Sequence, residues 1–102
     1  MDVFEVGPAS GELSLRDVVT KKKVNYFYGD IKNMEGDNFR KFVSEYEVDE
    51  RNDRFDIVFA SNVIEHVANP FRWVAELKRI TKKGGHIIIG CPGRVYDMMR
   101  RN

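Results

Sequence analysis

The sequence predicts an α/β fold built on a largely parallel sheet. Short apolar runs alternate with segments of helical periodicity along the chain. The clearest part extends from residue 55 to residue 93 and has the pattern of strand, helix, Gly-Gly turn and second strand. That order is typical of a right-handed crossover between two parallel strands, so we expect several such units in one sheet with helices on both faces.

The first elements are predicted from hydrophobic pattern alone. An apolar run at residues 3–6 predicts a strand that ends in a glycine-containing turn. Leucines and valines at helical spacing then predict a helix over residues 12–20. The aromatic run at residues 24–28 predicts the second strand, which a Gly-Asp pair closes.

The middle of the chain has a weaker pattern. Aromatic residues and a valine at helical spacing predict a helix over residues 37–46. Residues 47–54 are mostly charged and are expected to form a loop. Residues 55–60 form a short apolar run, which suits a strand buried on both faces.

The crossover helix has signals at both ends. Asn69 is placed to cap it, and Pro70 occupies its first position, where the missing N–H costs nothing. Two lysines followed by Gly84 predict a cationic last turn and a left-handed cap. Residues 86–89 predict the next buried strand, and residues 96–100 are expected to add a short turn of helix.

The second half of the chain also carries the motif of a known family. It consists of FDIVFASNVIEHV at residues 55–67, an Asn-Pro pair at 69–70, and a Lys-Gly-Gly turn at 83–85 before the last apolar strand. Together these segments resemble the class I S-adenosylmethionine-dependent methyltransferases, in particular the small-molecule, type 11-like members. The resemblance implies a Rossmann-like methyltransferase fold, S-adenosyl-L-methionine as cofactor, and direct displacement of the methyl group by a small-molecule or glycan-like acceptor.

The turn after the first strand resembles the first motif of that family. From Glu5 to Gly11 it reads Glu-Val-Gly-Pro-Ala-Ser-Gly. Glycines let the backbone approach a ligand closely, and the N-terminus of a following helix attracts a carboxylate. Ala9 replaces the family's middle glycine. The resemblance implies that Glu5, Gly7, Ala9 and Gly11 contact the cofactor, and a purely structural strand-to-helix turn is the alternative.

Asp30 ends the second strand, 19 residues after Gly11. A carboxylate there can accept hydrogen bonds from both hydroxyls of an adenosine ribose. The Gly-Asp pair also resembles a later segment of the family, whose Asp approaches the adenine, and a third interpretation is an Asp that only ends a strand. Only 25 residues separate Asp30 from Asp56, which predicts a shortened strand-and-helix unit between them.

The remaining site candidates follow the strand at residues 55–60. By resemblance, Ser61 and Asn62 contact the cofactor. His66 is the candidate catalytic residue, because a neutral imidazole can take a proton from an acceptor hydroxyl or amine. The alternative is that His66 packs its loop against the sheet, since methyl transfer to an acceptor that is already nucleophilic requires no base. No metal site is expected, because Cys91 is the single cysteine and no cluster has metal-ligand spacing.

Composition and length limit the partners. We expect one domain, residues 1–102, with 17 Lys and Arg against 16 Asp and Glu. The net charge of +1 gives no electrostatic reason to expect nucleic acid or a membrane surface as a partner. The single cysteine and the lack of a leader peptide or a long apolar span predict a cytoplasmic location.

Compared with the seven-stranded domain of the family, the chain is expected to be abbreviated. We expect about four to five strands, without the helices that close over the substrate and without the final antiparallel pair. The sheet would then have an exposed edge through which a homodimer can form. Two functions follow from this expectation: a methyltransferase, or a non-catalytic methyltransferase-like remnant that binds a cofactor or a partner.

Overall fold

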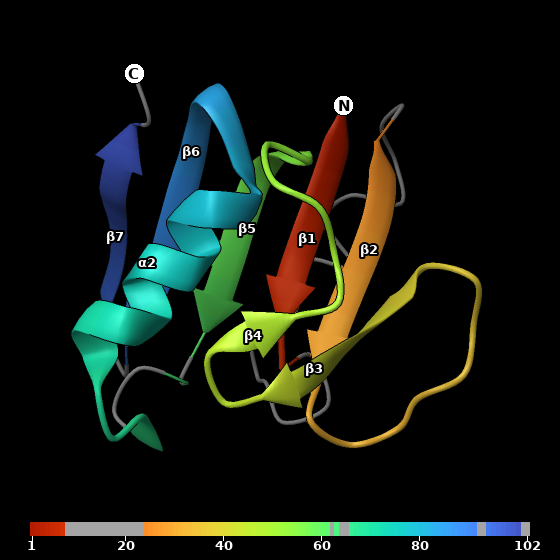
Figure 1. Ribbon diagram of the computed structural model, residues 1–102. Helices are drawn as coiled ribbons and strands as arrows, with labels where there is room; N and C mark the ends of the chain where they lie inside the picture. Colours follow the sequence, from red (N-terminus) through yellow and green to blue (C-terminus); the bar gives the residue numbers. More distant parts are fainter. Residues whose placement is uncertain (8–23, 62, 64–65, 92–93, 101–102) are drawn as a thin grey trace.

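The computed structural model describes residues 1–7, 24–61, 63, 66–91 and 94–100 (Figure 1). These residues form a seven-stranded sheet with the strand order β4-β3-β2-β1-β5-β6-β7, together with the helix α2. The strands are β1 (Asp2–Val6), β2 (Asn25–Asp30), β3 (Phe39–Ser44), β4 (Glu47–Val48), β5 (Phe55–Ser61), β6 (Thr81–Cys91) and β7 (Arg94–Arg100), and α2 spans Pro70–Ile80.

The sheet is parallel at its centre and antiparallel at both edges. β1 pairs in parallel with β2 and β5, and β3 and β6 extend the parallel set outwards. The edge strands β4 and β7 run antiparallel to their neighbours. The strand order reverses at β1, because the chain builds outwards through β2 and β3 and then continues on the other side with β5. The prediction of an α/β fold with a mostly parallel sheet is therefore confirmed.

The predicted number of four to five strands is wrong, because three elements were misassigned. Residues 37–46, predicted as a helix, contain β3, and the predicted loop at 47–54 contains β4. Residues 96–100, predicted as a turn of helix, belong to β7. Because β7 lies antiparallel to β6, the chain does carry an antiparallel strand after β6. Helices on both faces are not seen in the described residues, and the predicted helix at 12–20 lies outside them.

The apolar residues over 37–46 have helical spacing, but the same residues also fit a short strand. Phe42 is buried, with 5% of its surface exposed, and pairs with Val48, whereas its neighbour Val43 is 57% exposed. Neighbouring side chains of a strand point to opposite faces of the sheet, which accounts for this contrast. Aromatic and β-branched residues suit either assignment, so pairing with β2 and β4 determines the structure.

The connection between β2 and β3 takes only residues 31–38, although parallel strands usually need a crossover of a dozen residues or more. The strand register explains how so few residues suffice. Tyr28 pairs with Phe39 and Asp30 with Lys41, so β3 begins beside the end of β2. The chain has to return by only two residues, about 7 Å. As a consequence, β3 continues past the carboxyl end of β2.

The crossover helix begins where the sequence predicts and ends earlier. The Asn69 side chain accepts a hydrogen bond from the Arg72 N–H at 3.2 Å, and Pro70 follows it at the start of the helix. The predicted end at Gly84 is wrong, because Thr81 is already extended and begins β6, where it pairs with Phe55 of β5. The last-turn cations are therefore Lys78 and Arg79, and the two predicted lysines lie in β6.

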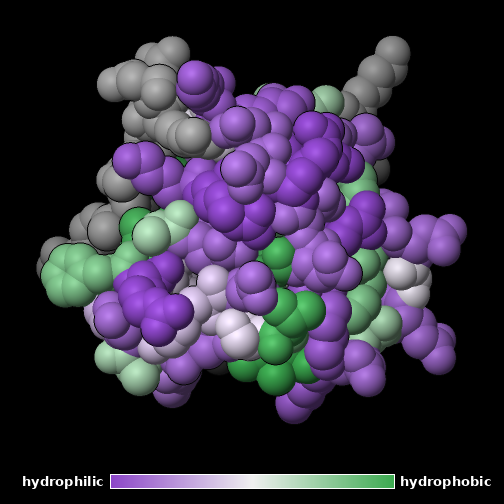
Figure 2. All heavy atoms as spheres, in the orientation of Figure 1, coloured by the Kyte–Doolittle hydropathy of each residue, from purple (hydrophilic) through white to green (hydrophobic). Residues whose placement is uncertain are grey.

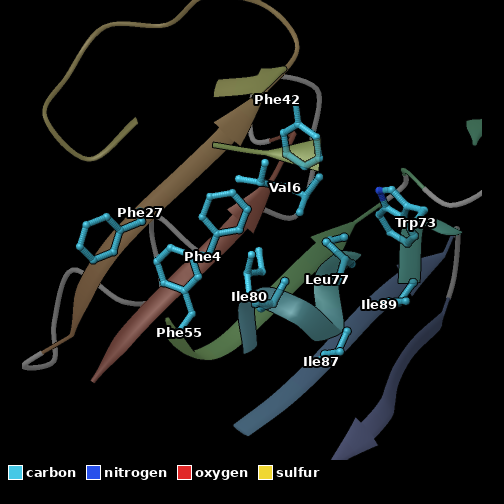
Figure 3. Packing of buried hydrophobic residues seen from close by; sticks show 13 residues of the cluster. Phe4, Val6, Phe27, Phe42, Phe55, Trp73, Leu77, Ile80, Ile87 and Ile89 are labelled. Atoms are coloured by element: carbon cyan, nitrogen blue, oxygen red, sulfur yellow. The ribbon is translucent and has the colours of Figure 1, made fainter. Parts of the chain in front are cut away.

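One face of the sheet is covered by α2 together with the β3–β4 hairpin (Figure 1). Leu77 and Ile80 of α2 are fully buried against the central strands, and Phe42 and Val48 bring the hairpin into the same cluster (Figure 3). Burial of each such side chain stabilises the fold by about 1.5–3 kcal/mol. The cluster consists of Phe4, Val6, Phe27, Phe42, Val48, Phe55, Val58, Ala60, Trp73, Leu77, Ile80, Ile87 and Ile89.

Two arginines cover the apolar face of β2. The guanidinium carbons of Arg40 and Arg54 lie 5.2 Å and 4.7 Å from the centre of the Phe27 ring. Glu50 pairs with both, at 2.9 Å from Nε of Arg40 and 3.8 Å from Nε of Arg54. Arginine stems supply apolar cover and their charged ends attract the ring face. The connection from β2 to β3, residues 31–38, forms no helix that could cover β2. The arginine network shields Phe27 from solvent instead.

Candidate functional site

A pocket of about 260 Å³ lies at the carboxyl ends of β1, β2 and β5, where the strand order reverses. Ligands of open parallel sheets bind at this position. The segments that follow β1, β2 and β5 all contribute to the pocket, as the sequence predicts. Its lining residues are Val6, Gly7, Asp30, Ile31, Phe42, Glu45, Val63, His66, Val67 and Trp73.

The pocket has mostly apolar walls with a few polar groups. Val6, Phe42 and Trp73 come from three different elements and lie at one end of the core cluster (Figure 3). Two carboxylates and one imidazole, those of Asp30, Glu45 and His66, also line it. An apolar pocket with a few convergent polar groups is the usual form of a small-molecule site. Figure 2 shows that the upper part of the face in view is mainly hydrophilic and that its apolar areas gather in the lower part, where β1 and β2 end in Figure 1.

Gly7 brings the backbone of the first turn against the opposite wall of the pocket. Its φ angle is +66°, a conformation that side chains disfavour. A Cβ at this position would lie 3.3 Å from Cγ2 of Val63. The Gly7 N–H donates to the carbonyl oxygen of Gly29 at 2.8 Å, which fixes the turn to the end of β2. The position therefore requires glycine both for its backbone angle and for the limited space.

Asp30 lies at the end of β2, beside the turn at Gly7. Its carboxylate oxygen Oδ1 accepts a hydrogen bond from the backbone N–H of Lys32 at 3.1 Å. The side chain is partly exposed and faces the pocket. The structure therefore brings two of the predicted cofactor residues, Gly7 and Asp30, to one place on neighbouring strands.

His66 also lines the pocket, from the segment between β5 and α2. Its side chain is exposed, and its backbone N–H donates to the Val63 carbonyl oxygen at 2.9 Å. This local hydrogen bond turns the chain so that His66 and Val67 both face the pocket. A ligand in the pocket would therefore lie within reach of the imidazole.

Two other predicted site residues do not line this pocket. Glu5 is 2% exposed and accepts a hydrogen bond from the Tyr26 hydroxyl. Ser61 is 4% exposed, and its Oγ has no hydrogen-bond partner among the described residues. Ser61 pairs with Gly90 of β6, and a Cβ built on Gly90 would lie 3.2 Å from that Oγ. There is therefore little space for a side chain at position 90. The predicted residues Ala9, Gly11 and Asn62 lie outside the described part of the chain.

The turn between β3 and β4 contributes residues that no sequence motif selects. Glu45 lines the pocket, and one of its carboxylate oxygens accepts a hydrogen bond from the Ala68 N–H at 3.1 Å. The Tyr46 hydroxyl oxygen accepts one from the Asn69 N–H at 2.9 Å. These contacts join positions 23 residues apart and depend on β3 being a strand. No local motif signals them.

The other end of the hairpin is held by an ion pair on α2. Glu76, which is nearly buried, accepts hydrogen bonds at 2.7 Å from Nε and Nη2 of Arg79. The same carboxylate accepts the Val48 N–H at 2.7 Å. The hydrogen bond from Arg79 to Glu76 raises the pKa of the guanidinium further above its usual range. The ion pair and the hydrogen bond from Val48 together fix β4 to the helix.

The described surface also has a pocket with a mainly charged lining. A second pocket of about 580 Å³ lies against β4 and is lined by Val43, Glu47, Val48, Asp49, Glu50, Arg51 and Arg79. No three His, Cys, Asp or Glu side chains in the described residues are grouped so that they could hold a metal ion. None of the helices described has the length and apolar character that crossing a membrane requires.

Comparison of the sequence with known proteins finds methyltransferases. The family model of a methyltransferase domain matches residues 19–89, more than two thirds of the chain. A curated relative is the mitochondrial ubiquinone biosynthesis O-methyltransferase of Dictyostelium discoideum. It is 30% identical over 94 residues, which cover 92% of this chain and 26% of the relative.

Two solved structures share the fold. A SAM-dependent methyltransferase from Aquifex aeolicus gives a TM-score of 0.68 at 18% identity, over 87% of this chain and 55% of that one. A complex from Haloferax volcanii, between the Trm112 methyltransferase activator and its candidate methyltransferase, gives 0.68 at 22% identity, over 86% and 43%. The chain thus spans about a quarter of the curated relative and about half of each solved chain. On the extent of the family match, the chain belongs to the class I S-adenosylmethionine-dependent methyltransferases.

Proposed function

We propose that this chain binds S-adenosylmethionine in the pocket at the ends of β1, β2 and β5 and transfers its methyl group to a small-molecule or glycan-like acceptor. The observation that supports this proposal is the meeting of Gly7, Asp30 and His66 in one apolar pocket at the strand-order reversal. A volume of 260 Å³ is slightly below the range of about 300–1,000 Å³ for pockets that enclose whole ligands. It suits the nucleoside part of the cofactor.

The residues present fit an adenosine group. Gly7 leaves a space that a Cβ would fill, and the Asp30 carboxylate at the end of β2 can accept hydrogen bonds from both ribose hydroxyls. Of the interpretations of Asp30, we favour the ribose role because β2 is the strand next to β1. The adenine role suits Glu45 better, because that carboxylate follows β3 and faces the same pocket.

Methyl transfer would require little covalent chemistry from the protein. When bound, the cofactor supplies an electrophilic methyl group on a sulfonium sulfur. Val6, Phe42 and Trp73 would exclude water from one side of the pocket, which favours an in-line approach of the acceptor. His66, at the pocket and exposed to solvent, is placed to hold a proton released by an acceptor hydroxyl or amine.

A second candidate function is a methyltransferase-like module that binds the cofactor or a partner without catalysis. The observation that favours this alternative is that Glu5 and Ser61, two of the predicted cofactor residues, are buried and do not line the pocket. A methyltransferase activator is one class of partner to test, because the similar Haloferax volcanii structure contains such a protein. A homodimer through the sheet edge and a cytoplasmic location stay predictions.

Isothermal titration with S-adenosylmethionine and S-adenosylhomocysteine tests the proposal. We expect binding to the wild-type chain and a loss of at least tenfold in affinity for Asp30→Ala, because hydrogen bonds to a charged group contribute about 1.5–3 kcal/mol. Gly7→Val should abolish binding, since the added side chain collides with Val63. Asp49→Ala, an exposed carboxylate outside this pocket, is the matched control. No binding to the wild-type chain at millimolar ligand would end the proposal.

A further inference from the structure

The tip of the β3–β4 hairpin is joined to the segment that precedes α2. Glu45 accepts a hydrogen bond from the Ala68 N–H at 3.1 Å, and the Tyr46 hydroxyl oxygen accepts one from the Asn69 N–H at 2.9 Å. The guanidinium carbon of Arg72 lies 4.5 Å from the centre of the Tyr46 ring, which adds a cation–π contact. These contacts between the hairpin tip and the start of α2 are called the hairpin latch below.

The hairpin latch connects opposite walls of the pocket. Phe42 and Glu45 form the wall on the hairpin side. His66, Val67 and Trp73 form the wall on the α2 side. Because the latch residues follow directly on both walls in sequence, the two hydrogen bonds set the distance between the walls. The width of the pocket therefore depends in part on Tyr46 and Asn69, which do not line it.

The two ends of the hairpin are held with different strength. At the β4 end, the Val48 N–H donates to the buried carboxylate of Glu76, and Nη2 of Arg79 donates to the Val48 carbonyl oxygen at 3.0 Å. At the tip, Ala68 and Asn69 are exposed to solvent. Water competes for hydrogen bonds at the exposed end far more than at the buried end. Local opening should therefore release the tip while the β4 end stays attached to α2.

We propose that the hairpin latch closes the pocket over its ligand, with Tyr46 as a positioning residue, and that opening of the latch lets the ligand enter and leave. The pocket of about 260 Å³ is partly open to solvent, and release of the hairpin tip would widen its mouth so that a ligand enters and leaves faster. The inference rests on the proposed function, because S-adenosylmethionine or its demethylated product is the ligand that the latch retains. The Glu45 side chain would also contact that ligand, so Tyr46 gives the cleaner test.

Tyr46→Phe removes the acceptor for the Asn69 N–H and keeps the aromatic ring under Arg72. We expect S-adenosylhomocysteine to dissociate about fivefold faster from this variant in stopped-flow measurements of Trp73 fluorescence, which follow the single tryptophan of the chain at the pocket wall. Amide hydrogen exchange at Asn69 in the ligand-free protein should accelerate by a similar factor. The melting temperature should change little.

Tyr28→Phe is the matched control. It also removes one tyrosine hydroxyl, which donates to the Glu35 carbonyl oxygen in the loop at residues 31–38 and not to the latch. Its dissociation rate and Asn69 exchange should equal those of the wild-type chain. Equal dissociation rates for Tyr46→Phe and the wild-type chain would overturn the latch and leave the proposed function intact. Failure of the wild-type chain to bind S-adenosylhomocysteine would overturn the proposed function and the retaining role together, whatever the exchange at Asn69 shows.

Discussion

The two sides of β1 are built by different means. On the β5 side, a regular crossover helix packs its apolar face on the sheet, and its start is marked in the sequence by Asn69 and Pro70. On the β2 side, residues 31–38 replace a crossover helix, and a hairpin with a network of arginines covers the sheet. The candidate pocket lies where the two sides meet. The comparison shows that apolar burial under a helix covers the β5 side, whereas on the β2 side a shifted register and ion pairs add to the burial of Phe27, Phe42 and Val48.

The largest effect should come from the apolar side. Leu77 is 0% exposed on α2, so Leu77→Ala should lower the free energy of unfolding by about 2–5 kcal/mol through lost burial and the cavity left behind. Urea unfolding followed by circular dichroism measures the change. Phe71→Ala on the same helix, where the side chain is 87% exposed, should change stability by less than about 0.5 kcal/mol. Similar losses for the two variants would contradict the packing of α2 described above.

A smaller effect, which depends on pH, should come from the charged side. Hydrogen bonds from Asn25 and Arg54 lower the pKa of Asp2. Burial raises the pKa of Glu50, but hydrogen bonds from the Arg51 backbone and the Arg40 side chain outweigh that effect, so the pKa of Glu50 is also lowered. A carboxyl whose pKa is lower in the folded protein stabilises it above the unfolded pKa. That stabilisation is lost as the pH falls through the folded pKa. Stability should therefore decline from about pH 5 downwards.

Arg54→Gln should reduce this acid sensitivity, because Arg54 pairs with both Asp2 and Glu50. The variant should be less stable at pH 7 and should lose less stability between pH 7 and pH 3, measured as the change in melting temperature. Arg51→Gln is the control, since Arg51 is exposed and contacts Glu50 only through its backbone N–H. An unchanged pH profile for Arg54→Gln would show that the arginine network does not stabilise the β2 side.

The same contrast explains how much of the fold could be predicted from the sequence. The strand at residues 55–60, the start of α2 and the family resemblance were predicted correctly, because each depends on signals that are close together in the chain. β3 and β7 were predicted as helical, because each is a strand through its pairing with a neighbouring strand, which the residue pattern within the segment does not reveal. The early end of α2 has the same cause, since Thr81 joins β6 by pairing with Phe55.

The candidate site divides in the same way. Gly7, Asp30 and His66 could be selected from motifs, and the structure places all three around one pocket. Glu45 and Tyr46 could not be selected, because their position depends on the shift of β3 past the end of β2. A short connection between parallel strands thus does more than shorten the chain. It moves the next strand towards the site and gives the pocket a wall.

The most direct test of the central claim is a two-dimensional amide NMR titration of the chain with S-adenosylhomocysteine. If the pocket at the β1–β5 reversal binds the cofactor, the largest shifts should occur at Gly7, Asp30, Glu45 and His66 and at the indole N–H of Trp73. The residues of the second pocket, beside β4, should shift little. Shifts concentrated at that second pocket, or no shifts at millimolar ligand, would contradict binding of the cofactor in the pocket at the ends of β1, β2 and β5.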